Sequence, residues 1–183
     1  SLTLREDFDS SKREVPMPHP EFLRDVNAGQ RLLLDDGEIE LYVKRKASNG
    51  DLFCEVVIGG ELKERKGVSA PDSRLTLPAI TKKDREDLRF GLQQGIDWVA
   101  MSFVRTGDDV RRLRWLIEEY DAGNDTPIIA KIEKFEALEN IEEIVSCADG
   151  IMVARGDLGV ETPAAAVPIH QKRIIKLCNQ VGK

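Results

Sequence analysis

The second half of the chain alternates between two hydrophobic patterns, and this alternation most constrains the fold. Three apolar runs have the length of buried strands: 96–101, 128–133 and 151–154. Around them, apolar residues recur every three or four positions, as in amphipathic helices, and Thr81 and Asp84 have the spacing of a helix-capping box. The order α-β-α-β-α-β-α is typical of a parallel sheet built from right-handed crossovers. We therefore predict an α/β module at about 80–183.

The first part of the chain has a different pattern, in which apolar and polar residues alternate. Leu52, Cys54, Val56 and Ile58 are one such series. Asp35–Gly37 and Asn49–Gly50 are hairpin signals between the predicted strands. Before them, the proline-rich run 16–20 is expected to be extended rather than helical. We predict an all-β module, a small barrel or sandwich, at about 1–79.

Composition excludes some classes of partner. The net charge of −6 argues against nucleic acid as the main partner. No apolar run approaches the roughly 20 residues of a membrane-spanning helix, so no membrane partner is expected. Cys54, Cys147 and Cys178 are far apart and lack metal-ligand spacing. This odd number of cysteines indicates reduced, buried thiols in a cytoplasmic protein.

A lysine and a glutamate end the second predicted strand. Alternation along a strand places Lys131 and Glu133 on one face and Ile132 on the other. Two buried charges are costly unless they pair with each other or bind a ligand. The pattern therefore indicates a site at this strand end, and a plain Lys131–Glu133 ion pair without a ligand is the alternative.

The third predicted strand runs directly into Arg155, Gly156 and Asp157. Neighbouring parallel strands lie about 4.8 Å apart, so Glu133 and Asp157 are expected to converge on one divalent ion. The glycines at 156 and 159 are expected to allow a sharp turn, and the amides of 158–160 to face an anion. An Arg155–Asp157 ion pair on an ordinary strand-to-helix turn is the alternative.

Several segments, in their order along the chain, closely resemble the pyruvate kinase family. They are Asp35–Gly37, Gly59–Gly60, Lys66–Val68, Leu77–Ala79, Lys83–Asp84, Ser102–Arg105, Lys131–Glu133 and Asp149–Glu161. In that family a small β-barrel lid domain is inserted into a (β/α)₈ TIM barrel after its third strand. The resemblance therefore implies that 1–79 is the lid domain and that 80–183 is a partial TIM barrel containing strands four to six.

The resemblance also implies roles in the predicted site. Lys131 matches the lysine that stabilises the transferring phosphoryl group and the enolate, and Glu133 and Asp157 match two ligands of Mg²⁺, for which Mn²⁺ can substitute. The segment that holds the carboxylate and phosphate of the substrate corresponds to Ala154, Arg155, Gly156 and Asp157.

In the lid, Asp36 and Lys66 resemble residues that approach the nucleotide when the lid closes. After Lys66–Val68 the chain departs from the family, because Ser69–Asp72 replaces the usual Asn-Leu-Pro-Gly.

The implied reaction is glycolytic phosphoryl transfer from phosphoenolpyruvate to ADP, which gives pyruvate and ATP in the cytoplasm. Positioning and charge neutralisation by Lys131 and the metal suit this chemistry. Members of the family are homotetramers and use K⁺, whose site is expected to lie outside this chain. Three strands cannot close an eight-stranded barrel, so we expect a fragment without turnover. Open strand edges are expected to let it self-associate.

Two other functions remain open at this stage. A Mg²⁺-dependent lyase or mutase acting on phosphoenolpyruvate or pyruvate enolates also places acidic ligands at strand ends. Those enzymes have no inserted β lid, so the lid motifs argue against them. A noncatalytic module that binds nucleotides or anions is the other alternative, and titration with Mg²⁺ and ADP distinguishes it from the enzyme.

Overall fold

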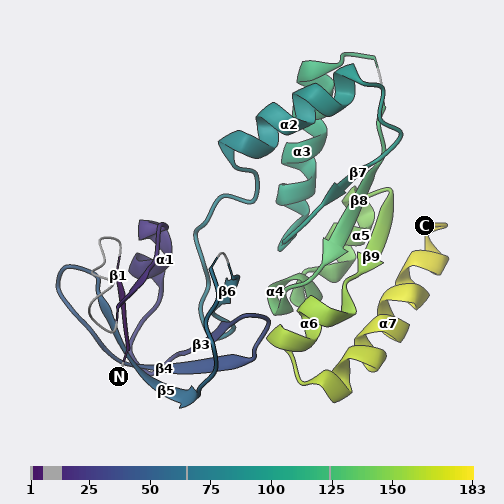
Figure 1. Ribbon diagram of the computed structural model, residues 1–183. Helices are drawn as coiled ribbons and strands as arrows, with labels where there is room; N and C mark the ends of the chain where they lie inside the picture. The colour runs from purple at the N-terminus through teal and green to yellow at the C-terminus, as the bar shows by residue number, and fades with distance from the viewer. Residues whose placement is uncertain (1, 6–13, 65, 124) are drawn as a thin grey trace. The chain divides into compact units, whose positions relative to one another are not determined.

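The computed structural model describes residues 2–5, 14–64, 66–123 and 125–183 (Figure 1). The chain forms two compact units, Ser1–Leu77 and Pro78–Lys183, and each is described by itself below. Among the residues described, no helix has the length and apolar character needed to cross a membrane.

The first unit is built on a curled six-stranded sheet with the strand order β2-β1-β5-β4-β3-β6. All neighbouring strands are antiparallel except β1 and β2. The strands are β1 (Leu2–Arg5), β2 (Glu14–Pro16), β3 (Arg31–Leu34), β4 (Ile39–Lys46), β5 (Leu52–Ile58) and β6 (Val68–Ser69). A short helix, α1 (Pro20–Asp25), begins at the last proline of the run that was predicted to be extended.

The hairpin signal between β3 and β4 is confirmed. Asp35 and Asp36 have φ values of 51° and 55°, and Gly37 has 90°, so three consecutive residues adopt the left-handed conformation. Asp and Gly tolerate that region better than branched residues do. The turn directs β4 back along β3, with Leu32 opposite Leu41 in the core.

The alternation predicted for β5 holds for only half of the strand. Leu52 and Cys54 are buried, whereas Val56 and Ile58 are 42% and 49% exposed. The alternating pattern therefore marks a buried face only along the first part of the strand. Alternation only specifies a face, and apolar neighbours cover that face along the first part of β5 alone.

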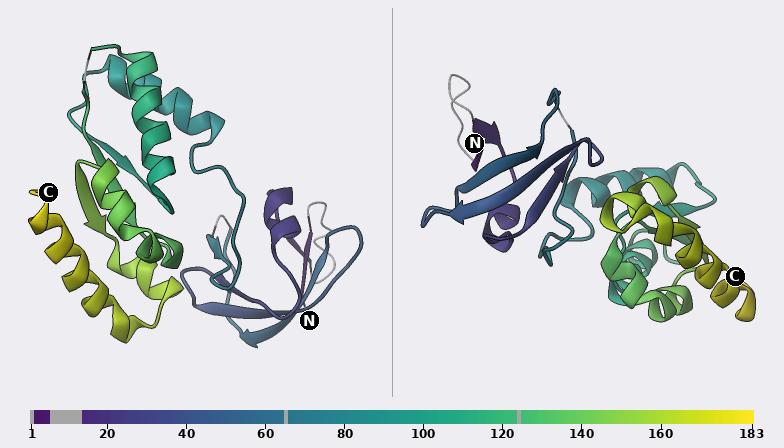
Figure 2. Two further views of the ribbon diagram at one scale, coloured as in Figure 1. Left: turned by 180° about the vertical axis from the view of Figure 1, so that it is seen from behind. Right: turned by 90° about the horizontal axis from the view of Figure 1, so that it is seen from below.

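The second unit is a parallel three-stranded sheet in the order β7-β8-β9, with helices following the strands (Figure 2). The strands are β7 (Val99–Met101), β8 (Ile128–Ile132) and β9 (Gly150–Val153). The helices are α2 (Lys82–Gln93), α3 (Gly107–Tyr120), α4 (Phe135–Glu139), α5 (Ile141–Cys147), α6 (Arg155–Glu161) and α7 (Val167–Gln180), with a 3₁₀ turn at Ala164–Ala166. The predicted alternation of helices and parallel strands is confirmed.

The core of this unit lies between the sheet and the helices, where α5 contacts both α3 and α7. Leu116 of α3 and Ile132 of β8 are completely buried in it. At the start of α2, the side chains of Thr81 and Asp84 form the predicted capping box.

All three cysteines have free thiols, but only two of them match the prediction of burial. Cys54 and Cys178 are buried, and burial raises the pKa of the Cys54 thiol to about 11. Cys147 is partly exposed at the end of α5, where its sulfur lies 3.1 Å from a guanidinium nitrogen of Arg111.

Candidate functional site at the strand ends

A buried ion pair lies at the carboxyl end of β8. Lys131 and Glu133 lie on one face, as predicted, with Nζ and Oε1 2.5 Å apart. The Glu133 side chain is 2% exposed and that of Lys131 is 25% exposed. Since an unpaired buried charge would be strongly unfavourable, the ion pair stabilises both side chains in place. This pair is compatible both with a ligand site and with the alternative of an ion pair alone.

The turn after β7 contacts both members of this pair. Lys131 Nζ donates to Ser102 Oγ at 3.1 Å, and the backbone N–H of Phe103 donates to Glu133 Oε2 at 2.9 Å. Each carboxylate oxygen of Glu133 therefore has its own donor. Phe103 has a φ of 55°, a conformation that a bulky side chain rarely adopts. Strain of this kind is concentrated at functional sites because the surrounding structure must maintain it.

No role was predicted from the sequence for Ser102 or Phe103. The available signal was their position, because polar groups just after a strand lie at the edge of the sheet where the other strand ends meet. The left-handed φ of Phe103 could not be predicted from the sequence, because the position is not a glycine or an asparagine, the residues that usually adopt this conformation.

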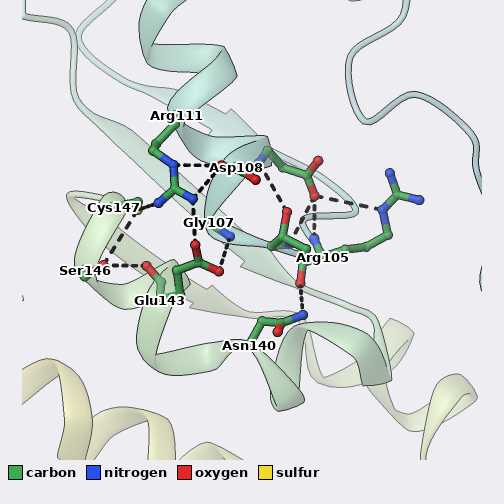
Figure 3. Close-up of polar contacts among 10 residues, drawn as sticks. Arg105, Gly107, Asp108, Arg111, Asn140, Glu143, Ser146 and Cys147 are labelled. Carbon is green, nitrogen blue, oxygen red and sulfur yellow. Dashed lines mark hydrogen bonds and ion pairs between the residues drawn. The ribbon is translucent and has the colours of Figure 1, made fainter.

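Side chains of α3 and the α4–α5 junction hold the chain that follows this turn. The Asp109 carboxylate accepts hydrogen bonds from the N–H groups of Arg105 and Thr106, at 2.9 and 3.1 Å. Asn140 Nδ2 donates to the carbonyl of Arg105 at 3.0 Å, as Figure 3 shows. The loop between β7 and α3 is thus bound on both sides, which limits how far the Phe103 turn can relax.

A second set of contacts in Figure 3 joins α3 to α5. The Arg111 guanidinium pairs with Asp108 and with Glu143, whose Oε1 lies 2.6 Å from it. Glu143 Oε2 also accepts the N–H of Gly107, at 3.4 Å. These carboxylates raise the pKa of Arg111, Glu143 having the larger effect. The network stabilises the packing of α3 against α5 behind the strand ends.

The end of β9 differs from its prediction. Residues 158–160 are inside α6, and the Leu158 N–H donates to the Ala154 carbonyl at 2.9 Å. Neither Gly156 nor Gly159 has a positive φ, so the expected sharp turn and the free amides at 158–160 are wrong. A helix occupies the segment that was predicted to be a turn, because a local turn pattern does not specify whether helical hydrogen bonds will continue.

Arg155, Gly156 and Asp157 therefore form the exposed first turn of α6. A Cβ atom added to Gly156 would meet no atom within 4 Å, so the backbone is bare on that side. The Ala154 N–H donates to the Ile132 carbonyl at 3.2 Å, which joins the start of α6 to the end of β8.

The register of the sheet brings the two predicted groups to one edge. Lys131 lies opposite Met152, and Ile132 lies opposite Val153. Glu133 directly follows β8, and Asp157 lies in the first turn of α6, after the end of β9. Their convergence on a shared ion remains a prediction, whereas the direct contact between Lys131 and Glu133 is observed.

Mg²⁺ at this edge remains a prediction from the types of donor present. Among the described residues, no group of three or more His, Cys, Asp or Glu side chains could hold a metal. The two carboxylates predicted to bind it are those of Glu133 and Asp157. Mg²⁺ is typically bound by one or two carboxylates, with waters and substrate oxygens completing its coordination.

In the first unit, Lys66 pairs with the turn that contains Asp36. Its Nζ lies 2.7 Å from Oδ1 of Asp35, and this hydrogen bond raises the pKa of Lys66, with Asp36 adding a smaller effect. Asp36 itself is exposed. Lys66 thus contacts the turn that contains Asp36, and the approach of these two residues to a nucleotide remains a prediction.

The departure from the family pattern at Ser69–Asp72 also has a structural role. The Asp72 carboxylate accepts the N–H of Arg31 at 3.0 Å and pairs with its guanidinium at 3.0 Å. The carbonyl of Asp72 accepts from Gln30 Nε2 at 2.7 Å. These bonds fix the loop to the start of β3.

Comparison with known proteins places this arrangement in a family. Residues 2–183 match the family model described as "Pyruvate kinase, barrel domain". The chain is 49% identical over 171 residues to the pyruvate kinase of Geobacillus stearothermophilus, covering 93% of this chain and 29% of that relative.

Two further relatives give similar values. Over 165 residues the chain is 47% identical to the pyruvate kinase of Clostridium perfringens, covering 90% of this chain and 34% of the relative. Over 164 residues it is 49% identical to pyruvate kinase 2 of Synechocystis, and the match covers 88% of this chain and 27% of that relative. The chain thus spans about a third of the length of these relatives. It belongs to the pyruvate kinase family.

Proposed function

We propose that this chain supplies the central part of an active site that transfers a phosphoryl group from phosphoenolpyruvate to ADP, giving pyruvate and ATP in glycolysis. One observation carries the proposal. Glu133 is almost completely buried at a strand end, and its two oxygens are held by Lys131 and by the Phe103 N–H. The helix that follows the neighbouring strand begins with Arg155-Gly156-Asp157. The name of the relatives, pyruvate kinase, supports this choice of reaction.

Lys131 has the position and charge to stabilise the transferring phosphoryl group. The Lys131 side chain is three-quarters buried, and the contacts of its ammonium with Ser102 and Glu133 fix its direction. A positioned cation in a site of low dielectric stabilises developing negative charge far better than one in water. The same charge stabilises the enolate that remains after phosphoryl transfer.

Glu133 at the end of β8 and Asp157 in the first turn of α6 would hold Mg²⁺, or Mn²⁺ in its place. The metal, when bound, neutralises charge on the phosphoryl oxygens during transfer. Glu133 is oriented by the Phe103 N–H, and Asp157 is carried by the first turn of α6.

The substrate carboxylate and phosphate would be held by Ala154, Arg155, Gly156 and Asp157. The Arg155 guanidinium offers paired donors suited to either anion. The bare backbone at Gly156 allows a ligand to approach closely, since no side chain stands in the way.

The family assignment also implies the larger arrangement. The module at 1–79 would be the lid, with Asp36 and Lys66 approaching the nucleotide, and 80–183 would contribute strands four to six of a TIM barrel. A homotetrameric, cytoplasmic enzyme with a K⁺ site outside this chain fits the same assignment. The 183-residue chain alone is expected to lack turnover, since a three-stranded sheet does not enclose a site that takes eight strands.

Metal titration tests the proposal. Mn²⁺ binding to the chain, followed by electron paramagnetic resonance, should be lost in both Glu133→Gln and Asp157→Asn. ADP binding in the presence of Mg²⁺, followed by calorimetry, should weaken in Lys66→Met. Metal binding that is unchanged in the two carboxylate variants would favour an ion pair without a ligand, and steady ATP formation by the purified chain would refute the expected lack of turnover.

A further inference from the structure

Lys134 joins three segments of the candidate site, although nothing so far gives it a role. It follows Glu133 and precedes the first residue of α4. Its Nζ lies 2.6 Å from Oε1 of Glu161, in a pair whose side chains are 23% and 7% exposed. The same ammonium lies 5.8 Å from the centroid of the Phe103 ring, within the range of a cation–π interaction.

One of these two partners lies in the turn that orients Glu133, and the other lies in the helix that carries Asp157. The backbone N–H of Phe103 holds Oε2 of Glu133. Glu161 is the last residue of α6, and Asp157 lies one turn earlier on that helix. A contact at Glu161 therefore restrains the helix that carries Asp157, and a contact at the Phe103 ring restrains the turn that orients Glu133.

We propose that Lys134 is a positioning residue, which holds the Phe103 turn and α6 so that Glu133 and Asp157 can bind one divalent ion. The part of the inference that concerns the ion rests on the proposed function. The part that concerns the attachment of α6 to the end of β8 does not, because it follows from the contacts of Lys134 alone.

The sign of the effect on metal binding separates positioning from simple electrostatics. Lys134 is a cation beside a proposed cation site, so removal of its charge by itself should strengthen Mn²⁺ binding. If Lys134 positions the ligands, its removal should weaken binding in spite of the lost repulsion. Replacement of a residue that orients a metal ligand typically weakens metal affinity by about 10- to 100-fold. Because the lost repulsion acts in the opposite direction, we expect a weakening near tenfold.

The experiment uses the complete 183-residue chain and four variants. Mn²⁺ affinity is measured by electron paramagnetic resonance for the parent, Lys134→Met, Lys134→Arg, Glu133→Gln and Lys82→Met. The last is the matched control, because it also replaces a lysine by methionine in an ion pair, the exposed Lys82–Glu86 pair of α2. We expect about tenfold weaker binding in Lys134→Met, recovery to within about threefold in Lys134→Arg, and no change in Lys82→Met.

Amide hydrogen exchange of the same proteins gives a second readout that needs no metal. In Lys134→Met, the amides of α6 should exchange about tenfold faster, while those of α3 should keep the parental rate and so show that the unit is folded. Lys134→Arg should restore the slow exchange of α6.

The outcomes distinguish the inference from the proposed function. Mn²⁺ binding that is equal or tighter in Lys134→Met overturns the positioning role, and so does unchanged exchange in α6. If Glu133→Gln binds Mn²⁺ as tightly as the parent, the proposed metal site is refuted, and with it the role of Lys134 at that site. Faster exchange of α6 in Lys134→Met would still support the attachment of this helix.

Discussion

Replacing Gly107 with alanine should destabilise the second unit in the parent chain but stabilise it when Glu143 is also replaced by alanine. Gly107 is buried at the first position of α3, and an added Cβ would lie 2.5 Å from Cγ of Glu143. That is 0.9 Å short of an ordinary 3.4 Å contact (3.4 − 2.5), so the Glu143 side chain must move.

The cost follows from what Glu143 would lose on moving. Its hydrogen bond from the buried Gly107 N–H contributes about 1 kcal/mol, and loss of it leaves that donor without its acceptor. Its ion pair with Arg111 is about half exposed and contributes about 0.5 kcal/mol. Against this, alanine in place of glycine restricts the unfolded chain and stabilises by about 0.5 kcal/mol. The net expectation is a loss of about 1 kcal/mol.

In the Glu143→Ala background both interactions are already absent and the space is free. Gly107→Ala should then stabilise the unit by about 0.5 kcal/mol. The four proteins of this double-mutant cycle should show a coupling free energy of about 1.5 kcal/mol.

Urea unfolding followed by tryptophan fluorescence measures this coupling. Trp98 and Trp115, the two tryptophans of the chain, both lie in the second unit, so the signal reports on that unit alone. Gly159→Ala is the control, because its Cβ would meet Val167 at an ordinary 3.8 Å, and it should stabilise by about 0.5 kcal/mol. If Gly107→Ala changes stability by the same amount and sign with and without Glu143, the steric reasoning is refuted.

Three further changes test the packing, the capping and the electrostatics of the same unit. Leu116→Ala should cost about 3 kcal/mol in urea unfolding, since this completely buried side chain would leave a cavity; a loss below about 1 kcal/mol would contradict the assigned core. Thr106→Ala removes the capping box of α3 and should cost about 1 kcal/mol, whereas Thr106→Ser should retain most of that stability. Although burial opposes it, hydrogen bonds from Arg114 and from the Ile128 N–H lower the pKa of Asp149 in the folded state. The stability that Asp149 contributes should therefore be present above about pH 4 and disappear as the pH falls through the lowered pKa. The difference in the free energy of unfolding between the parent and Asp149→Asn should narrow only in acid. A difference that does not depend on pH would contradict this reasoning.

Much of the candidate site could be predicted because it depends on local rules. Strand alternation has a period of two residues, so Lys131 and Glu133 had to share a face once β8 was recognised. Parallel connections place successive strand ends at one edge, which predicted that Glu133 and Arg155–Asp157 would be neighbours. The contact of Lys131 with Glu133 confirms the first prediction, and the pairing of β8 with β9 brings the strand ends together as expected.

Other features depend on residues far apart in sequence and had no local signal. β1 pairs with β5 through Leu4 and Leu52, across nearly the whole first unit, and the charged N-terminal segment did not indicate a strand. The left-handed backbone of Phe103 is similar, because neighbours such as Glu133 and Asn140 hold that turn and its own residue type disfavours it.

The sequence by itself determined the two modules, the hairpin at Asp35–Gly37, the shared face of Lys131 and Glu133, and membership of the family. These follow from periodicity, turn chemistry and motif order, which act over a few residues. Only the tertiary structure decided that Phe103 orients Glu133, that residues 155–161 form a helix, and that Lys134 connects that helix to the turn after β7. Such features arise when packing brings distant groups within hydrogen-bonding distance, and the free energy of those contacts then exceeds local preference.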